Sequence, residues 1–306
     1  MVLFDHNYVK NLRGLFLTNK IEIAVIGGSG LYGMDELSDI EERHVTTPFG
    51  SPSDALIIGT LHGQRVAFLP RHGRGHVLTP TEVPYRANMY ALKTLGVKYV
   101  IAVSACGSLR EDFAPGHIVI PDQLFDFTKN RESSFFGSGH VAHLSPAYPF
   151  STELSAALAA AVSAANGVLH EGGTFITIEG PRFSTKAESD LFRNWGMSII
   201  GMTTSPEAFL AAEAEMAYAV MAHVTDYDVW HEDENPVTVE MVINVLKRNT
   251  AVAQEALSKL VAAKASWAGS MAAHDGLQDA LITAADQIPR STRENMSPIT
   301  GRYLRK

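Results

Sequence analysis

Two carboxylates separated by one residue form a pattern that could carry out acid–base chemistry. Asp226 and Asp228 flank Tyr227 just after the apolar run 217–224. In extended backbone, residues i and i+2 face the same side, so both acids can point into one pocket. Carboxylates so placed raise each other's proton affinity, and one of them could serve as a general acid. A helix-capping Asp beside a solvated one is the alternative interpretation.

A glycine loop and a basic pair follow two other apolar runs. Gly27-Gly28-Ser29-Gly30 comes after 21–26, and Arg71-His72 comes after 66–69. Glycine backbone N–H groups, a hydroxyl and a planar guanidinium all suit phosphate. A turn without a ligand and a surface Arg beside a capping His are the alternatives.

The same glycine loop formally matches a dinucleotide fingerprint, as Gly28-x-Gly30-x-x-Gly33. That fingerprint also wants an acidic residue at the end of the next strand, where this chain has Thr60 and Leu61. A dinucleotide-binding oxidoreductase is therefore a weaker interpretation than a phosphate site.

Further hydrogen-bond donors and one aromatic residue also lie at or after the ends of apolar runs. Ser104, Ala105 and Thr203 follow or end two more apolar runs and offer hydroxyl or backbone donors. Phe183, after the turn Gly180-Pro181, could stack on a sugar or base, although a core Phe is the alternative. No His, Cys, Asp and Glu cluster has metal-ligand spacing, so we expect no metal and no cofactor.

Short apolar runs alternate with helical patterns along the chain. The runs expected to be strands are 21–26, 55–59, 66–69, 99–104, 118–120, 175–178, 198–202 and 217–224, and the expected helices are 85–95, 153–165, 186–195, 206–216, 239–265 and 277–285. This alternation predicts one α/β domain around a largely parallel or mixed sheet, with the ligand site at the carboxyl ends of the strands. We expect an N-terminal extension over 1–20, the domain over 21–288 and a polar C-terminal tail over 289–306.

Composition and charge limit the kinds of molecule that the chain is expected to bind. Apolar residues make up 46% and charged residues 19%, which is typical of a folded globular chain. A net charge of −8 disfavours nucleic acid, and no apolar run approaches the roughly 18 residues of a membrane span. The single Cys106 excludes an intrachain disulfide and favours the cytoplasm. A small buried thiol is a commoner role for it than a nucleophile.

Seven segments, in this order, resemble the trimeric purine-nucleoside phosphorylase family over 21 to about 265. They are GGSGL at 27–31, TPFGSPSDAL at 47–56, RHGRGH at 71–76, SACGSLRE at 104–111, IEGPRFSTKAES at 178–189, GMTTSPE at 201–207 and TDYDVW at 225–230. The resemblance implies a single α/β domain with a mixed, barrel-like central sheet flanked by helices. It also implies a homotrimer that uses inorganic phosphate as co-substrate. The expected activity is phosphorolysis of 5′-methylthioadenosine, and a phosphorylase for 6-oxopurine nucleosides or methylthioinosine is the nearest rival.

The resemblance further implies roles for individual residues. The expected phosphate site is Ser29, Arg71, His72, Ser104, Ala105 and Thr203. The expected nucleoside contacts are Met202, Phe183, Cys106, Thr225, Val239 and Val242, together with His143 from a neighbouring subunit. Asp226 is expected to protonate N7 of the purine while Asp228 accepts from the 6-amino group. Val239 and Val242 align with the apolar methylthio pocket, and the resemblance leaves open which of Leu277 or Leu281, if either, closes a neighbour's 5′ pocket.

Overall fold

A mixed sheet of eleven strands forms the centre of the described structure. The computed structural model describes residues 20–231 and 239–304, without the side chains of Ser29, Val239 and 241–248. The strands are β1 (Ile21–Gly27), β2 (Ser38–Arg43), β3 (Leu56–Leu61), β4 (Gln64–Pro70), β5 (Tyr99–Ser108), β6 (Ile118–Ile120), β7 (Gln123–Phe127), β8 (Leu169–Glu171), β9 (Thr174–Ile178), β10 (Ile199–Gly201) and β11 (Ala217–Asp226). The main path runs β2-β3-β4-β1-β5-β10-β9-β7.

The sheet branches at β5, which has three neighbours. Along most of its length β5 pairs in parallel with β1 on one side and β11 on the other. At its carboxyl end, residues 107–108 pair antiparallel with β10 instead. Beyond β11, the short strands β6 and β8 extend the branch. The branching curves the sheet, and the expected single α/β domain with a mixed central sheet is confirmed.

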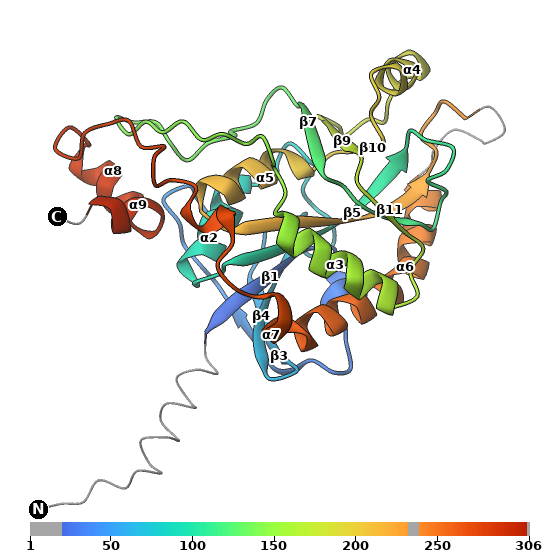
Figure 1. Cartoon of the computed structure of the whole chain (residues 1–306), viewed down its shortest axis with the longest axis horizontal. Helices are drawn as coiled ribbons and strands as arrows, with labels where there is room; N and C mark the ends of the chain where they lie inside the picture. The colour runs from blue at the N-terminus through green and yellow to red at the C-terminus, as the bar shows by residue number, and fades with distance from the viewer. Residues whose placement is uncertain (1–19, 232–238, 305–306) are drawn as a thin grey trace, which may run out of the picture.

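Helices cover both faces of the sheet (Figure 1). They are α2 (Tyr85–Thr94), α3 (Thr152–Ala164), α4 (Lys186–Asn194), α5 (Thr204–Glu213), α6 (Val239–Ala262), α7 (Lys264–Trp267), α8 (Arg290–Asn295) and α9 (Ser297–Leu304), with 3-10 turns η1 (Ser29–Tyr32) and η2 (Ala272–Asp275). One core packs α2, α5 and α9 on the sheet through residues such as Met89, Leu210 and Ile299. The other packs α3 and α6 through Leu158 and Leu257. Burial of these apolar faces is the main source of stability.

The segment 277–285, expected to be helical, forms turns over 277–280 and an isolated bridge from Leu281 to Ala142. Ile282 N donates to Val141 O, and His143 N donates to Ala280 O, both at 2.9 Å. These bonds satisfy backbone groups that a helix would have satisfied internally, so tertiary pairing overrides the local propensity. We call residues 140–143 and 280–283 together the arm.

The C-terminal stretch expected to be a polar tail contains α8 and α9. Ile299 and Thr300 of α9 are buried, and Tyr90 of α2 donates to Asn295 O at 2.5 Å. Residues 289–304 therefore pack on the domain, while the N-terminal extension 1–19 lies outside the described residues.

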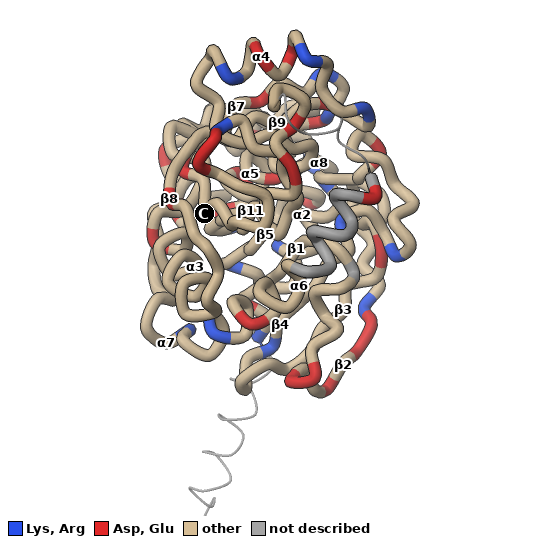
Figure 2. Tube along the Cα trace, turned by 90° about the vertical axis from the view of Figure 1, so that its right-hand side faces the viewer, with Lys and Arg blue, Asp and Glu red and all other residues tan. Residues whose placement is uncertain are grey.

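The edge strand β2 is charged and exposed, and Figure 2 shows acidic residues along its trace in red. Asp39, Glu41 and Glu42 on this edge hinder pairing with another sheet. Within 20–231 and 239–304, the structure contains no helix with the length and apolar character of a membrane span.

Candidate active site

The carboxyl ends of β5 and β11 meet the antiparallel strand β10 around Gly107. A Cβ atom on this glycine would lie 2.9 Å from Asp226 Oδ1 and 3.1 Å from Ile200 Cγ2. It would also lie 3.4 Å from Asp228 Cβ. Gly107 therefore leaves the space that Asp226 occupies, and a larger residue would displace the carboxylate.

Both carboxylates of the pair are buried at the end of β11, at 5% and 7% exposure for Asp226 and Asp228. Asp226 Oδ1 accepts from the backbone N of Asp228 at 2.8 Å, and Asp226 Oδ2 accepts from Thr225 Oγ1 at 2.7 Å. Thr225 Oγ1 also lies 3.2 Å from Cys106 O, so this hydroxyl joins β11 to β5. The sequence prediction that the two acids lie together is consistent with this geometry.

Asp228 differs electrostatically from Asp226. Burial raises the pKa of Asp228, and the hydroxyls of Ser189 and Ser184 and the Val229 N–H offset part of the rise. Asp228 Oδ2 has no hydrogen bond of normal geometry to a described residue. Because the backbone places Asp228 at φ +54°, the side chain is directed by an uncommon left-handed conformation that Asp tolerates. Asp228 is thus suited to hold a proton.

Arg71 follows β4, and most N–H groups of its guanidinium already form hydrogen bonds within the protein. Its side chain is 4% exposed and forms a bidentate pair with Glu207, with Nε–Oε1 at 2.6 Å and Nη2–Oε2 at 3.0 Å. Nη1 donates to Val103 O at 3.0 Å, and Nη2 also approaches Ile26 O. Arg71 can therefore offer a phosphate one remaining N–H of Nη1, and not the planar fork that the sequence suggested.

His72 is a neutral imidazole with a defined tautomer. Nδ1 lies 2.8 Å from Leu78 O, an acceptor, so Nδ1 carries the hydrogen. Burial, helped by the charge of Arg71, lowers the pKa of His72 to about 4. The ring also stacks on His76, with centroids 4.3 Å apart. Nε2 is left as an acceptor, which suits a phosphate that still carries a proton.

The other expected phosphate residues follow neighbouring strand ends. Ser104 and Ala105 lie within β5, which extends further than the sequence predicted, and Ser104 is buried. Thr203 precedes α5 and is buried without a side-chain capping bond. Ser29 begins η1 directly after β1, but its side chain lies outside the described part of the chain.

Met202 and the turn before Phe183 are in contact. A Cβ on Gly180 would lie 2.6 Å from Met202 Sδ, and Gly180 has φ +68°, so only glycine fits here without strain. Phe183 is 37% exposed, which is consistent with an aromatic face open to a ligand. Cys106 is buried in the core, and burial raises the pKa of its thiol, so it is a poor nucleophile.

The described contacts around Gly107 do not include three of the expected nucleoside contacts. His143 lies on the arm and is exposed. Val239 and Val242 belong to the first turn of α6, and their side chains are outside the described part.

Two supporting residues were missed by the sequence analysis. Glu207, which holds Arg71, lies within the GMTTSPE segment, and a lone acid in the apolar pattern of α5 was a signal for it. Arg131, in the segment after β7, bonds three backbone carbonyls around Met202 and Glu179, and nothing in the sequence marks it.

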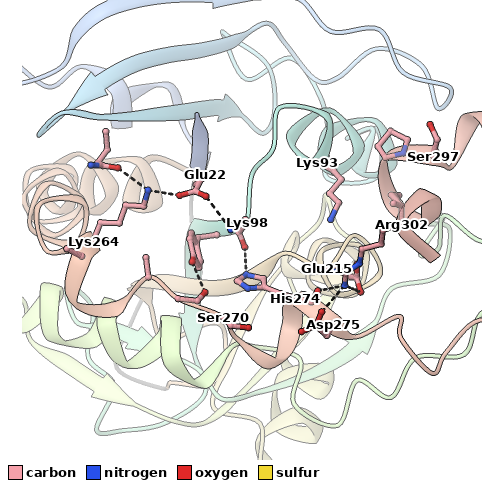
Figure 3. A pocket seen from close by; sticks show the side chains of 17 residues that line it. Glu22, Lys93, Lys98, Glu215, Lys264, Ser270, His274, Asp275, Ser297 and Arg302 are labelled. Atoms are coloured by element: carbon pink, nitrogen blue, oxygen red, sulfur yellow. Dashed lines mark hydrogen bonds and ion pairs between the residues drawn. The ribbon is translucent and has the colours of Figure 1, made fainter. Parts of the chain in front are cut away.

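A separate cavity of about 980 Å³ lies at the other end of the strands, by the start of β1 and β5 (Figure 3). Its charges are largely paired with one another. Glu22 binds Lys98 and Lys264, and Arg302 binds Glu215 and Asp275. These pairs join α7 and α9 to the domain, which indicates a structural role for the cavity wall.

Comparison with known proteins defines the class to which this fold and site belong. The family model of the phosphorylase superfamily matches residues 22–262. The chain is a member of that superfamily. Among residues 20–231 and 239–304, no group of three or more His, Cys, Asp or Glu side chains could hold a metal ion.

Individual relatives are similar over nearly their whole length. S-methyl-5′-thioadenosine phosphorylase of Chloroflexus aurantiacus is 56% identical over 92% of this chain and 98% of the relative. The enzyme of the same name from Gloeobacter violaceus is 53% identical over 92% and 95%. A crystal structure of methylthioadenosine phosphorylase from an antarctic soil metagenomic library has a TM-score of 0.89 and 48% identity, covering 92% and 99%.

Proposed function

We propose that this chain catalyses phosphorolysis of 5′-methylthioadenosine, releasing adenine and 5-methylthioribose 1-phosphate. The observation that carries the proposal is the buried pair Asp226 and Asp228 beside Gly107. A carboxylate at the 6-position of a purine accepts from an amino group but faces a 6-oxo group with like polarity. The relatives named above are phosphorylases of this nucleoside, and a related structure from Schistosoma mansoni contains methylthioadenosine.

The reaction balances with groups of the chain and phosphate alone. A phosphate oxygen attacks C1′ of the sugar as the bond from C1′ to N9 breaks, through an oxocarbenium-like transition state. The electron pair stays on the purine, and one carboxyl of the pair supplies a proton to N7. Phosphate held by His72, Arg71 Nη1, Thr203 and the donors of β5 stabilises the developing sugar cation.

The two acids enter this reaction in different states. From the sequence, the proton was expected on Asp226; in the structure, burial raises the pKa of Asp228 and favours a proton there. Both oxygens of Asp226 accept hydrogen bonds, a role suited to a carboxylate. We propose that the pair starts the reaction with its proton on Asp228, and Asn variants of each acid separate the two roles.

We propose that the active form is a homotrimer in which His143 reaches the sugar of a neighbouring subunit. In support, His143 is exposed on the arm beside Val141 and Ile282, which are 42% and 62% exposed. Exposed apolar side chains grouped in this way favour an interface. Leu277 is buried in its own core, so Leu281 is the better candidate to close the neighbour's 5′ pocket. We also propose that the protein is located in the cytoplasm.

Assay of 5′-methylthioadenosine, inosine and adenosine side by side, with and without phosphate, tests the function. We expect phosphate-dependent loss of 5′-methylthioadenosine with the highest kcat/KM. A higher kcat/KM for inosine would indicate a 6-oxopurine phosphorylase. Adenine binding without phosphate-dependent turnover would indicate a non-catalytic purine-binding protein, and titration with a nicotinamide cofactor is expected to show no binding.

A further inference from the structure

Arg131 is a charged residue in the interior, close to several loops of the candidate site. It lies in the segment after β7, and its side chain is only 1% exposed. A buried guanidinium is costly unless its donors find partners, so its contacts show what it holds in place.

One side of the guanidinium fixes the turn between β10 and α5. Nη1 donates to Met202 O at 2.6 Å and to Ser205 O at 2.7 Å. These two carbonyls bracket Thr203, an expected phosphate ligand, and Met202 is the expected sugar contact. A shift of this turn would therefore move a phosphate ligand and a sugar contact together.

The other side of the guanidinium fixes the turn that leads to Phe183. Nη2 donates to Glu179 O at 2.7 Å, and Nε donates to Glu179 Oε1 at 3.3 Å. Glu179 in turn accepts from Thr81 Oγ1 at 2.6 Å and Asn130 N at 3.1 Å. Next to it, Gly180 lies against Met202. One cation thus joins the loops after β4, β7, β9 and β10.

We propose that Arg131 is a positioning residue for the reaction, which sets Thr203 and Met202 relative to phosphate and sugar. This inference rests on the proposed function. Arg131 touches no expected substrate atom and acts through the backbone that it holds. The planar fork is essential, because a lysine ammonium cannot reach the carbonyls of both turns at once. The pair Asp226 and Asp228 lies on β11, outside these contacts.

The variant Arg131→Lys tests the proposal, with Arg65→Lys as the matched control. Arg65 is also mostly buried and bonds a backbone carbonyl, Asp39 O at 2.8 Å, and the carboxylate of Glu41, but at the sheet edge. For Arg131→Lys we expect a phosphate KM about tenfold higher and a kcat about 10- to 100-fold lower, the scale of a small misplacement. We expect the dissociation constant of adenine to change less than about threefold, because Asp226 and Asp228 lie outside the contacts of Arg131 and only the turn before Phe183 is shared.

Two results would overturn the positioning role. One is kinetic constants for Arg131→Lys that equal those of Arg65→Lys. The other is a loss of adenine and phosphate affinity in equal proportion, as expected from general loosening. If Arg131→Lys does not fold, Glu179→Gln weakens the same junction and must raise the phosphate KM while sparing adenine; unchanged constants would again reject the proposal.

Separate measurements distinguish failure of the proposed function from failure of the positioning role of Arg131. Wild-type protein that turns over no nucleoside would reject the function itself. The rise in melting temperature with added phosphate still compares Arg131→Lys with the wild type in that case. An equal rise in both would reject the positioning role.

Discussion

At the scale of single residues, hydrogen bonding and burial separate two carboxylates that look equivalent in the sequence. Asp226 accepts hydrogen bonds at both oxygens, whereas Asp228 Oδ2 has no such partner among the described residues. Burial raises the pKa of Asp228, and Ser184 and Ser189, from the region of α4, offset part of this rise. Spacing alone identified the pair but not which acid holds a proton, because α4 is distant in sequence.

Asp226→Asn is expected to lower kcat/KM for 5′-methylthioadenosine by about 10- to 1,000-fold, the range for loss of one acid–base or electrostatic group. An Asn amide donates to a 6-oxo group, so the ratio of inosine to 5′-methylthioadenosine turnover should rise. Steady-state assays with both nucleosides provide the measurement. Full activity on 5′-methylthioadenosine in this variant would rule out a role for Asp226 in the reaction.

Asp228→Asn is expected to stabilise the fold at neutral pH while lowering activity. Because the folded-state pKa of Asp228 is raised, the folded chain binds this proton more tightly than the unfolded chain. Stability therefore falls as pH rises from the ordinary Asp pKa through the raised one, and the full penalty is present at neutral pH. The gain should be roughly 1 kcal/mol at pH 7, an ordinary size for a stabilising substitution.

Urea unfolding of wild type and Asp228→Asn at pH 7 and pH 4 measures this effect. We expect the difference in unfolding free energy to shrink at pH 4, because this pH lies close to the ordinary Asp pKa, at the lower end of the range over which the penalty develops. A variant that is less stable than wild type at pH 7 would contradict the burial argument. Asp126→Asn, at an exposed position, is the control.

At the scale of elements, strand positions were largely predictable and their lateral neighbours were not. Buried apolar runs gave β1, β5 and β11 close to their observed bounds, since central strands need continuous apolar residues. The edge strand β2, with sequence SDIEER, was missed because it buries little and has no apolar pattern. Likewise, the segment 277–285 has a helical pattern, but pairing with 141–143 decides its conformation.

From local sequence, the candidate site is predicted to lie in the loops that follow the strands, because the carboxyl ends of parallel strands lie at one edge of a sheet. It could not predict that Glu207 occupies the fork of Arg71. That contact joins residues 136 apart in sequence, and only the packing of α5 against the sheet creates it. The same limit explains why Arg131 was missed.

Gly107→Ala is expected to impair the site where β5, β10 and β11 meet. The added Cβ would lie 2.9 Å from Asp226 Oδ1, so the carboxylate must move. A shift of this kind should lower kcat/KM by about 10- to 100-fold. Gly269→Ala, where a Cβ meets nothing within 4 Å, should keep wild-type kinetics. Equal kinetics for the two variants would show that the Asp226 carboxylate can shift without loss of activity.

At the scale of the whole molecule, the proposed homotrimer would use the arm to complete a neighbour's site. His143 and the exposed Val141 and Ile282 lie together on it, away from the buried carboxylates. A heterologous contact between identical chains would place each arm at a neighbour's site, and three such contacts close a ring.

Coexpression of His143→Ala and Asp226→Asn chains tests this arrangement. Each variant alone should be nearly inactive. In each mixed trimer, about one site in three combines Asp226 from one chain with His143 from another, because each site draws on two chains across a heterologous contact. We expect specific activity to rise toward that fraction of wild type.

Differently tagged chains allow the mixed trimers to be isolated before assay, and sedimentation reports their mass. Activity no higher than the mean of the two separate variants would show that His143 serves its own chain or none. A monomeric mass would reject the shared site outright.

The two halves of the arm are synthesised at different times, because they lie far apart in the sequence. Val141 N donates to Thr283 Oγ1, 142 residues later in the chain. At usual translation speeds, the first half of the arm leaves the ribosome on the order of ten seconds before its partner is made. Until then, Val141 and its neighbours have no strand to pair with. In the proposed homotrimer, subunits that join through the arm would therefore do so only once Thr283 has been synthesised.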